Sequence, residues 1–324
     1  MTTTVNRAST THTSLPPLSL EEWEPTKETL HLWVQIVGKI RMATSPPRNH
    51  WWHVPLYVDV RGLTTRRLHA ANGTSFQIDF DFVDHRLVVR TNRGAVESFA
   101  LVDDLSVAAF DERLHATLRD LGVDVAIRET PYGLPATTPF PQDVDHATYD
   151  PHAVERFWRI LDWTDGVFET FAGWYCGKTS PVHLFWHSLD LAVTRFDGER
   201  SPDAPALGAV DREAYSHNVV SFGFWAGDPN VREPTFYAYA SPEPDGLRAQ
   251  ALRPDDAHWV ERVGGSLALL PYEAVRNAPD PTNTLLAFLE SAYQASAGLG
   301  GWDRRDLAST WCPPPRELHD LLGG

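Results

Sequence analysis

The chain has 324 residues, of which 42% are hydrophobic, and a formal net charge of −15. This amount of apolar sequence can fill one large core or two ordinary ones, so it excludes a globally disordered chain. A strongly acidic protein is repelled by phosphate backbones, and we therefore expect no nucleic-acid partner.

The cysteines and the N-terminal residues bear on the cellular compartment. Cys176 and Cys312 do not form a CxxC pair, which argues against a zinc thiolate site and a disulfide framework. Such usage is typical of the reducing cytosol, so we expect a cytoplasmic location. No stretch approaches 18 uninterrupted apolar residues, so no membrane span is expected. Residues 1–17 are polar, lack the apolar segment of a signal peptide and predict a disordered tail.

Residues 18–129 predict a first α+β half. A stripe of Leu30, Trp33, Val37 and Ile40 indicates a helix from Pro25 to about Met42. Alternating or β-rich segments then predict strands at 53–62, 76–83, 86–94 and 97–102. A second amphipathic helix is expected over 106–121, and a further strand over 123–127.

A proline-rich segment at 130–151 reads as a linker between this half and a second α+β half at 152–302. The second half begins with a predicted helix over 152–171, followed by one long strand over 177–196. Further strands are expected at 217–225 and 235–241, and a capped helix from Asp280 to near Gly298. The fold class expected is α+β, with each half an antiparallel sheet flanked by amphipathic helices, and a C-terminal extension over 303–324.

Short motifs recur in the same order in the two halves, which suggests an internal duplication. A chain rich in Trp and Pro also produces such coincidences by chance, and that alternative stays open. The first half contains Gly38-Lys39, Thr44-Ser45-Pro46, Trp52-His53 and Arg61; the second contains Gly177-Lys178, Thr179-Ser180-Pro181, Trp186-His187 and Arg195.

The step from His to Arg is eight residues in both copies, from His53 to Arg61 and from His187 to Arg195. Because side chains on a strand repeat with a period of two, each pair is expected to share one face, with His183 beside the second pair. A pseudo-twofold axis between the halves would then bring both pairs to a common cleft, where ligand sites concentrate.

The chemistry expected in this cleft is recognition of a small anion. Guanidinium groups bind carboxylates or phosphates, and histidines near neutral pKa relay protons. The structural alternative is that the histidines pack on a polar face and the arginines form salt bridges, for example to Asp59 or Asp190. The candidate anion ligands are Arg61, Arg195, Lys39 and Lys178, and the candidate catalytic residues are His53, His183, His187 and His217.

No ready metal or nucleotide motif is found. On one regular strand His183 and His187 would lie roughly 13 Å apart, too far to share an ion. A metal site would need distant segments, for example His183 with His217. No GxGxxG follows a strand and no P-loop occurs, so the cofactor stays undetermined.

Three segments carry a resemblance to a known family: "HVPLYVDVRGLTT", "KTSPVHLFWHSLDLAVTRF" and "AYSHNVVSFGFW". In these the chain resembles a bacterial family known only as a domain of unknown function, from about Leu18 to Trp302. The resemblance implies a soluble bacterial protein and supplies no activity, cofactor or catalytic residue.

Three functions are compatible with these observations. The first is an enzyme that acts on a small anionic substrate in a His- and Arg-lined cleft between the halves. The second is a non-catalytic small-molecule-binding protein that uses the same cleft. The third is an interaction scaffold whose exposed Trp and Phe side chains dock a partner.

Overall fold

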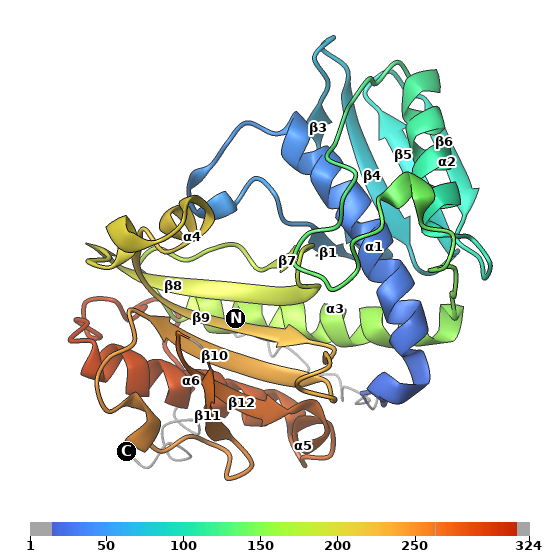
Figure 1. The fold of residues 1–324 in the computed structure, drawn as a ribbon. Coiled ribbons are helices and arrows are strands. Elements are labelled where there is room, and N and C mark those ends of the chain that lie inside the picture. Colours follow the sequence, from blue (N-terminus) through green and yellow to red (C-terminus); the bar gives the residue numbers. More distant parts are fainter. Residues whose placement is uncertain (1–14, 263, 316–324) are drawn as a thin grey trace, which may run out of the picture.

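The computed structural model describes residues 15–262 and 264–315, which form two six-stranded antiparallel sheets and six α-helices (Figure 1). In the first sheet the strands follow one another in chain order, except that the short β3 (Leu68–His69) pairs with the first two residues of β4 (Ser75–Asp81). Its strands are β1 (Tyr57–Asp59), β2 (Gly62–Thr64), β3 (Leu68–His69), β4 (Ser75–Asp81), β5 (Arg86–Thr91) and β6 (Val96–Ala100).

Helices α1 (Leu20–Thr44) and α2 (Val107–Asp120) cover one face of the first sheet. Strand β4 alternates along its length, and its phenylalanines are buried on the helix side. Phe80 lies parallel to Phe110 of α2 at 6.1 Å between ring centroids, and Phe110 stacks on Trp33 of α1 at 5.0 Å. Burial of these aromatic rings holds the two helices on the sheet.

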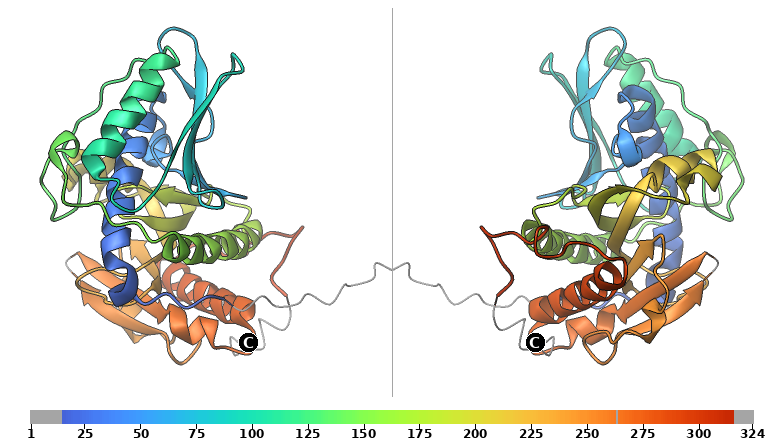
Figure 2. Two further views of the ribbon diagram at one scale, coloured as in Figure 1. Left: turned by 90° about the vertical axis from the view of Figure 1, so that its right-hand side faces the viewer. Right: turned by 90° about the vertical axis from the view of Figure 1, so that its left-hand side faces the viewer.

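The second sheet is also a meander, except that its last two strands exchange places. Helices α3 (Pro151–Gly173) and α6 (Pro281–Leu299) lie side by side beneath one of its faces (Figure 2). The strand order is β7 (His183–Phe185), β8 (Asp190–Arg200), β9 (His217–Trp225), β10 (Thr235–Ser241), β12 (Gly265–Pro271) and β11 (His258–Arg262). Two short helices complete this half, α4 (Ala209–Ala214) and α5 (Tyr272–Arg276). The 3₁₀ turns are η1 (Asn49–Trp51), η2 (Phe140–Gln142), η3 (Ala204–Ala206) and η4 (Leu247–Ala249).

The two halves are joined at the edges of their sheets. Leu56, just before β1, and Leu184 of β7 exchange two backbone hydrogen bonds of 2.8 Å each. The segment 130–151 runs across α1, where the amide of Gln35 donates to the backbone oxygen of Tyr132 at 2.8 Å and accepts from its nitrogen at 2.9 Å. The α+β class and the two similar antiparallel halves are thereby confirmed, and their similarity fits an internal duplication.

The prediction of one long strand over 177–196 was wrong. The chain instead folds into a hairpin, in which β7 and β8 are separated by a turn over residues 186–189. Leu189 has a φ of 54°, a left-handed conformation that reverses the chain. After this turn the alternation restarts with Asp190, so Arg195, which was predicted to share a face with His183, points to the opposite side.

Several boundaries also differ from the sequence-based expectations. Helix α1 begins at Leu20, so Pro25 lies inside it and not at its start. Proline has no backbone N–H to donate to the carbonyl of Glu21, but Glu21 is exposed, so water can reach this carbonyl. Residues 123–127 form no strand, whereas β2, β3, β11 and α4 were not predicted. Of the tail predicted over 1–17, residues 1–14 lie outside the described part, whereas Leu15 is buried. Residues 316–324 of the predicted extension also lie outside the described part.

Among the described residues, none of the helices combines the length and the apolar character that crossing a bilayer requires.

Arg195 is the charged group that ties the second sheet to its helices. Its side chain is 2% exposed and points from β8 into the layer formed by α3 and α6. The guanidinium donates to the backbone oxygen of Phe171 at 2.6 Å and lies 3.6 Å from a carboxylate oxygen of Glu290. It also stacks over the Phe171 ring at 3.5 Å. A buried charge in such a layer depends on its partners.

We expect Arg195→Ala to lower the free energy of unfolding by about 3–5 kcal/mol, because the substitution leaves the Glu290 carboxylate buried without its partner. The matched variant is Arg61→Ala, whose guanidinium is 46% exposed, so that water replaces much of what its ion pairs with Asp81 and Asp84 supply. Urea denaturation of both variants measures the difference. Equal stability of the two variants would contradict this reading of Arg195.

Candidate functional site

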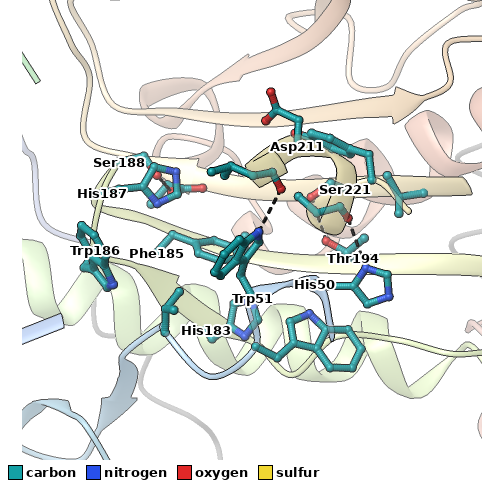
Figure 3. A pocket seen from close by; sticks show the side chains of 18 of the residues that line it. His50, Trp51, His183, Phe185, Trp186, His187, Ser188, Thr194, Asp211 and Ser221 are labelled. Carbon is teal, nitrogen blue, oxygen red and sulfur yellow. Dashed lines mark hydrogen bonds between the residues drawn. The ribbon is translucent and has the colours of Figure 1, made fainter. Parts of the chain in front are cut away.

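A cavity of about 680 Å³ lies over the face of the second sheet that α3 and α6 leave uncovered (Figure 3). Its floor consists of alternate residues of the central strands, which the period of two directs to this side. The floor includes Asp190, Thr194, Phe196, Ser221, Trp225 and Tyr237. Asp190, Thr194, Ser221 and Tyr237 bring polar groups into this floor.

The walls and the roof come from both halves. Lys39 near the end of α1 and Tyr132 of the linker line one side. Above the floor, Trp51 of η1 donates from its indole nitrogen to the backbone oxygen of Val210 in α4 at 2.9 Å, as the dashed line in Figure 3 shows. The cavity therefore lies between the halves, although the strands of the first sheet contribute no residue to it.

A glycine in the floor positions the most polar part of the cavity. A Cβ atom at Gly223 would lie 2.3 Å from the Tyr237 ring, so only glycine lets that ring lie across β9. The Tyr237 hydroxyl then reaches over to β8 and donates to Oδ2 of Asp190, while the Ser188 hydroxyl donates to Oδ1. Burial and the nearby Asp190 raise the pKa of Tyr237, so this phenol stays protonated and remains a donor.

Two histidines lie beside this carboxylate. His183 is 1% exposed, burial lowers its pKa to about 3, and its Nδ1 has no hydrogen-bond partner among the described residues. Burial also lowers the pKa of His187, an effect that the negative charge of Asp190 partly opposes. Both imidazoles are therefore neutral near pH 7, and each has one nitrogen that can donate and one that can accept a hydrogen bond.

At the other end of the cavity His50 forms a second polar group. Its backbone has a φ of 55°, and its Nδ1 lies 3.2 Å from the backbone oxygen of Ala214, which requires the proton on Nδ1. Nε2 is then free to accept from the ammonium of Lys178 at 2.6 Å. The His217 ring lies 5.5 Å from the His50 ring. Burial, and next the charge of Lys178, lower the pKa of His50.

Of the residues predicted from the sequence, His183, His187 and Lys39 line the cavity. The Lys39 ammonium donates to the backbone oxygens of Arg128 and Thr130, and burial lowers its pKa to about 8. Lys178 and His217 do not line the cavity but contact His50, which does. The structure thus gathers five of the eight predicted residues around one cavity, at its two ends.

The other three predicted residues lie elsewhere. His53 accepts a hydrogen bond from the backbone nitrogen of Arg48 at 3.1 Å and does not line the cavity. Arg61 lies on the first sheet, where it pairs with Asp81 at 2.7 Å. Arg195 lies beneath the floor, on the helix side of the second sheet. The shared cleft of two His–Arg pairs is therefore not present, because the turn at residues 186–189 places Arg195 on the other face.

A metal shared by His183 and His217 does not fit the strand register. His183 is in register with Ala192 and hence with Gly223, six residues or roughly 20 Å along β9 from His217. Within residues 15–262 and 264–315, no group of three or more His, Cys, Asp or Glu side chains could hold an ion.

Sequence reasoning missed the polar group formed by Asp190, Ser188 and Tyr237. One continuous strand over 177–196 would direct Asp190 away from His183, whereas the turn at residues 186–189 brings both to the same face. The available signal was Ser188 and Asp190, two residue types that are common in turns.

We expect Gly223→Ala to lower the free energy of unfolding by about 1–3 kcal/mol, because the added methyl group collides with the Tyr237 ring. Chemical denaturation measures this loss. The matched variant Gly166→Ala, in an open position on α3, should be neutral or stabilising. A neutral effect at Gly223 would contradict the close packing described for Tyr237.

We expect His183→Leu to make the stability of the protein less dependent on pH. The folded-state pKa of His183, about 3, lies below its unfolded value, so the unfolded chain binds more protons and stability falls as the pH is lowered from about 6.5 towards 3. Between pH 7 and pH 5 the variant should lose about 2 kcal/mol less than the wild type. Denaturation curves at both pH values provide the measurement; parallel losses would show that His183 titrates normally.

The comparisons with known proteins place the chain in a family without assigning an activity. The family described as "Family of unknown function (DUF5996)" matches residues 15–309, which include both sheets and every cavity residue named above. No curated protein and no solved structure matches the chain. Because the match covers most of its length, the chain belongs to this family of unknown function, DUF5996.

Proposed function

We propose that the protein binds a small organic molecule in the cavity between its halves. The observation that supports this most directly is the composition of the cavity. Its volume of about 680 Å³ is typical of ligand sites, which bury a small molecule among aromatic side chains and a few fixed polar groups. Aromatic side chains in the lining include Trp51, Trp52, Phe185, Trp225, Tyr237 and Tyr239.

An anionic ligand, expected from the sequence, is not part of this proposal. That expectation depended on Arg61 and Arg195, and neither lines the cavity. Lys39, Arg128 and Arg262 do line it, but the Lys39 ammonium already donates to two backbone oxygens and the Arg262 guanidinium lies over the ring of Tyr239. The scaffold alternative has less support, because Trp311 is the one Trp or Phe among the strongly exposed large hydrophobics of the described residues.

Catalysis on the bound molecule is the second candidate function. The observation that favours it is the position of His187, a neutral imidazole in the same cavity as the Asp190 carboxylate. A neutral imidazole can take a proton from a bound molecule, and a nearby carboxylate stabilises the imidazolium that forms. The enzyme proposal therefore assigns His187 as the base and leaves Arg61 and Arg195 without a role in the chemistry.

The test is a fragment screen by ligand-observed NMR on the wild type and on Ala192→Phe. Ala192 lies in the floor and is 2% exposed, so a phenyl group there reduces the space available to a ligand. We expect a set of aromatic fragments to bind the wild type and to lose binding in this variant. Ala126→Phe, at an exposed position outside the cavity, should keep binding. Fragment binding that is absent from the wild type, or that survives Ala192→Phe in a folded variant, would overturn the proposal.

A further inference from the structure

We propose that the cavity selects a ligand with a cationic amine, whose ammonium group binds Asp190 between the rings of Phe185, Trp225 and Tyr237. This inference rests on the proposed function and adds the chemical class of the ligand. Three observations support it. Aromatic residues surround the Asp190 carboxylate, no positively charged side chain pairs with this carboxylate, and Nδ1 of the nearby His183 has no hydrogen-bond partner among the described residues.

Asp190 is enclosed by aromatic residues on both sides. In the sheet register Asp190 pairs with Phe185 of β7 and with Trp225 of β9, and side chains opposite each other lie about 5 Å apart at their Cβ atoms. The Tyr237 ring comes across Gly223 from β10, at 5.3 Å between its centroid and that of Trp225. A carboxylate at the floor of an aromatic frame is the arrangement in which proteins bind ammonium groups.

The negative charge of Asp190 is not matched by a positive side chain. Asp190 is 7% exposed, and both hydrogen bonds to its carboxylate oxygens come from neutral hydroxyl groups, those of Ser188 and Tyr237. None of the ion pairs among the described residues involves Asp190. A buried carboxylate without a countercharge is costly, and a ligand cation would provide that countercharge.

Three cationic side chains line the cavity, those of Lys39, Arg128 and Arg262, and none of them forms an ion pair with Asp190. Lys39 donates to backbone oxygens of residues 128 and 130, and Arg262 lies over the ring of Tyr239 at 4.7 Å. His187 also lies near Asp190, and because burial lowers its pKa its imidazole stays neutral and does not repel an incoming ammonium. A ligand cation is therefore the complement that this end of the cavity lacks.

His183 provides an independent indication of a ligand. Its ring lines the cavity, is almost fully buried, and has an Nδ1 without a hydrogen-bond partner among the described residues. His183 pairs with Ala192, so it lies one diagonal step from Asp190, about 7–8 Å away in an antiparallel sheet. A ligand that fits both groups carries an amine and, at about that distance, a second polar group or an aromatic ring edge.

The test compares three probes of nearly the same shape: phenethylamine, the neutral 2-phenylethanol and the anionic 3-phenylpropanoate. Isothermal titration calorimetry at pH 7 measures their affinities for the wild-type protein. We expect the amine to bind at least about tenfold more tightly than the alcohol, the ratio that one charge-assisted contact supplies, and the anion to bind most weakly. Equal binding of amine and alcohol, tighter binding of the anion, or no binding of the amine at millimolar concentration would overturn the inference.

Two variants locate the selectivity. Asp190→Asn keeps the shape and removes the charge, so the advantage of the amine over the alcohol should disappear while alcohol binding remains. Asp197→Asn is the matched control, because Asp197 lies on the same strand, accepts hydrogen bonds and does not line the cavity. An amine preference that survives Asp190→Asn would also overturn the inference.

The outcomes also separate this inference from the proposed function. If the alcohol binds as tightly as the amine and both lose binding in Ala192→Phe, the cavity binds small molecules without selecting a cation. If the fragment screen detects no ligand in the cavity, the proposed function fails, and the inference fails with it.

Discussion

The alternation of β8 is the constraint on which the rest of the second half depends. Its odd residues point into the layer of α3 and α6, where Arg195 meets Glu290. Its even residues point into the cavity, where Asp190 meets the hydroxyl of Tyr237. One strand therefore carries a buried cation on one face and a buried anion on the other. The first is paired within the protein, whereas the second has neutral donors only.

The cavity combines a rigid floor with a less regular roof. The floor belongs to hydrogen-bonded central strands, so the spacing of its polar groups is set by the register. The roof consists of the segment around Trp51 and the short helix α4, which meet through the indole hydrogen bond to Val210 and through hydrogen bonds of His50 to Glu213 and Ala214.

Much of the architecture could be predicted, because it depends on local patterns. The alternation of β4 and the apolar stripes of α2, α3 and α6 are visible in the sequence, and these elements lie within a few residues of their expected positions. The site was harder, since it depends on a turn of four residues. Leu189 carries no strong turn signal of its own, yet its left-handed backbone decides which face the residues of β8 occupy from Asp190 to Phe196.

Turns that have no clear sequence signal also explain why neither Arg61 nor Arg195 lies in the predicted cleft. The echo of His and Arg in the two halves is present in the sequence, and periodicity alone placed both arginines in one cleft. Arg61 instead follows β1 at the surface, and Arg195 lies in the core, because residues between each His and Arg turn the chain in different ways. Contacts between distant segments, such as Tyr237 with Asp190 or Trp51 with Val210, are not encoded in any local period.

The short bridge between Leu56 and Leu184 has a consequence for how the halves could exist apart. Edge strands with free backbone groups recruit other chains and promote aggregation. In the intact protein the edges of both sheets meet at this bridge. The backbone N–H and C=O groups of Leu56 and Leu184 bond to each other, and separating the halves would leave them without these partners. Neither half is therefore a good candidate for independent expression, and a separated half would expose a template for intermolecular strand pairing.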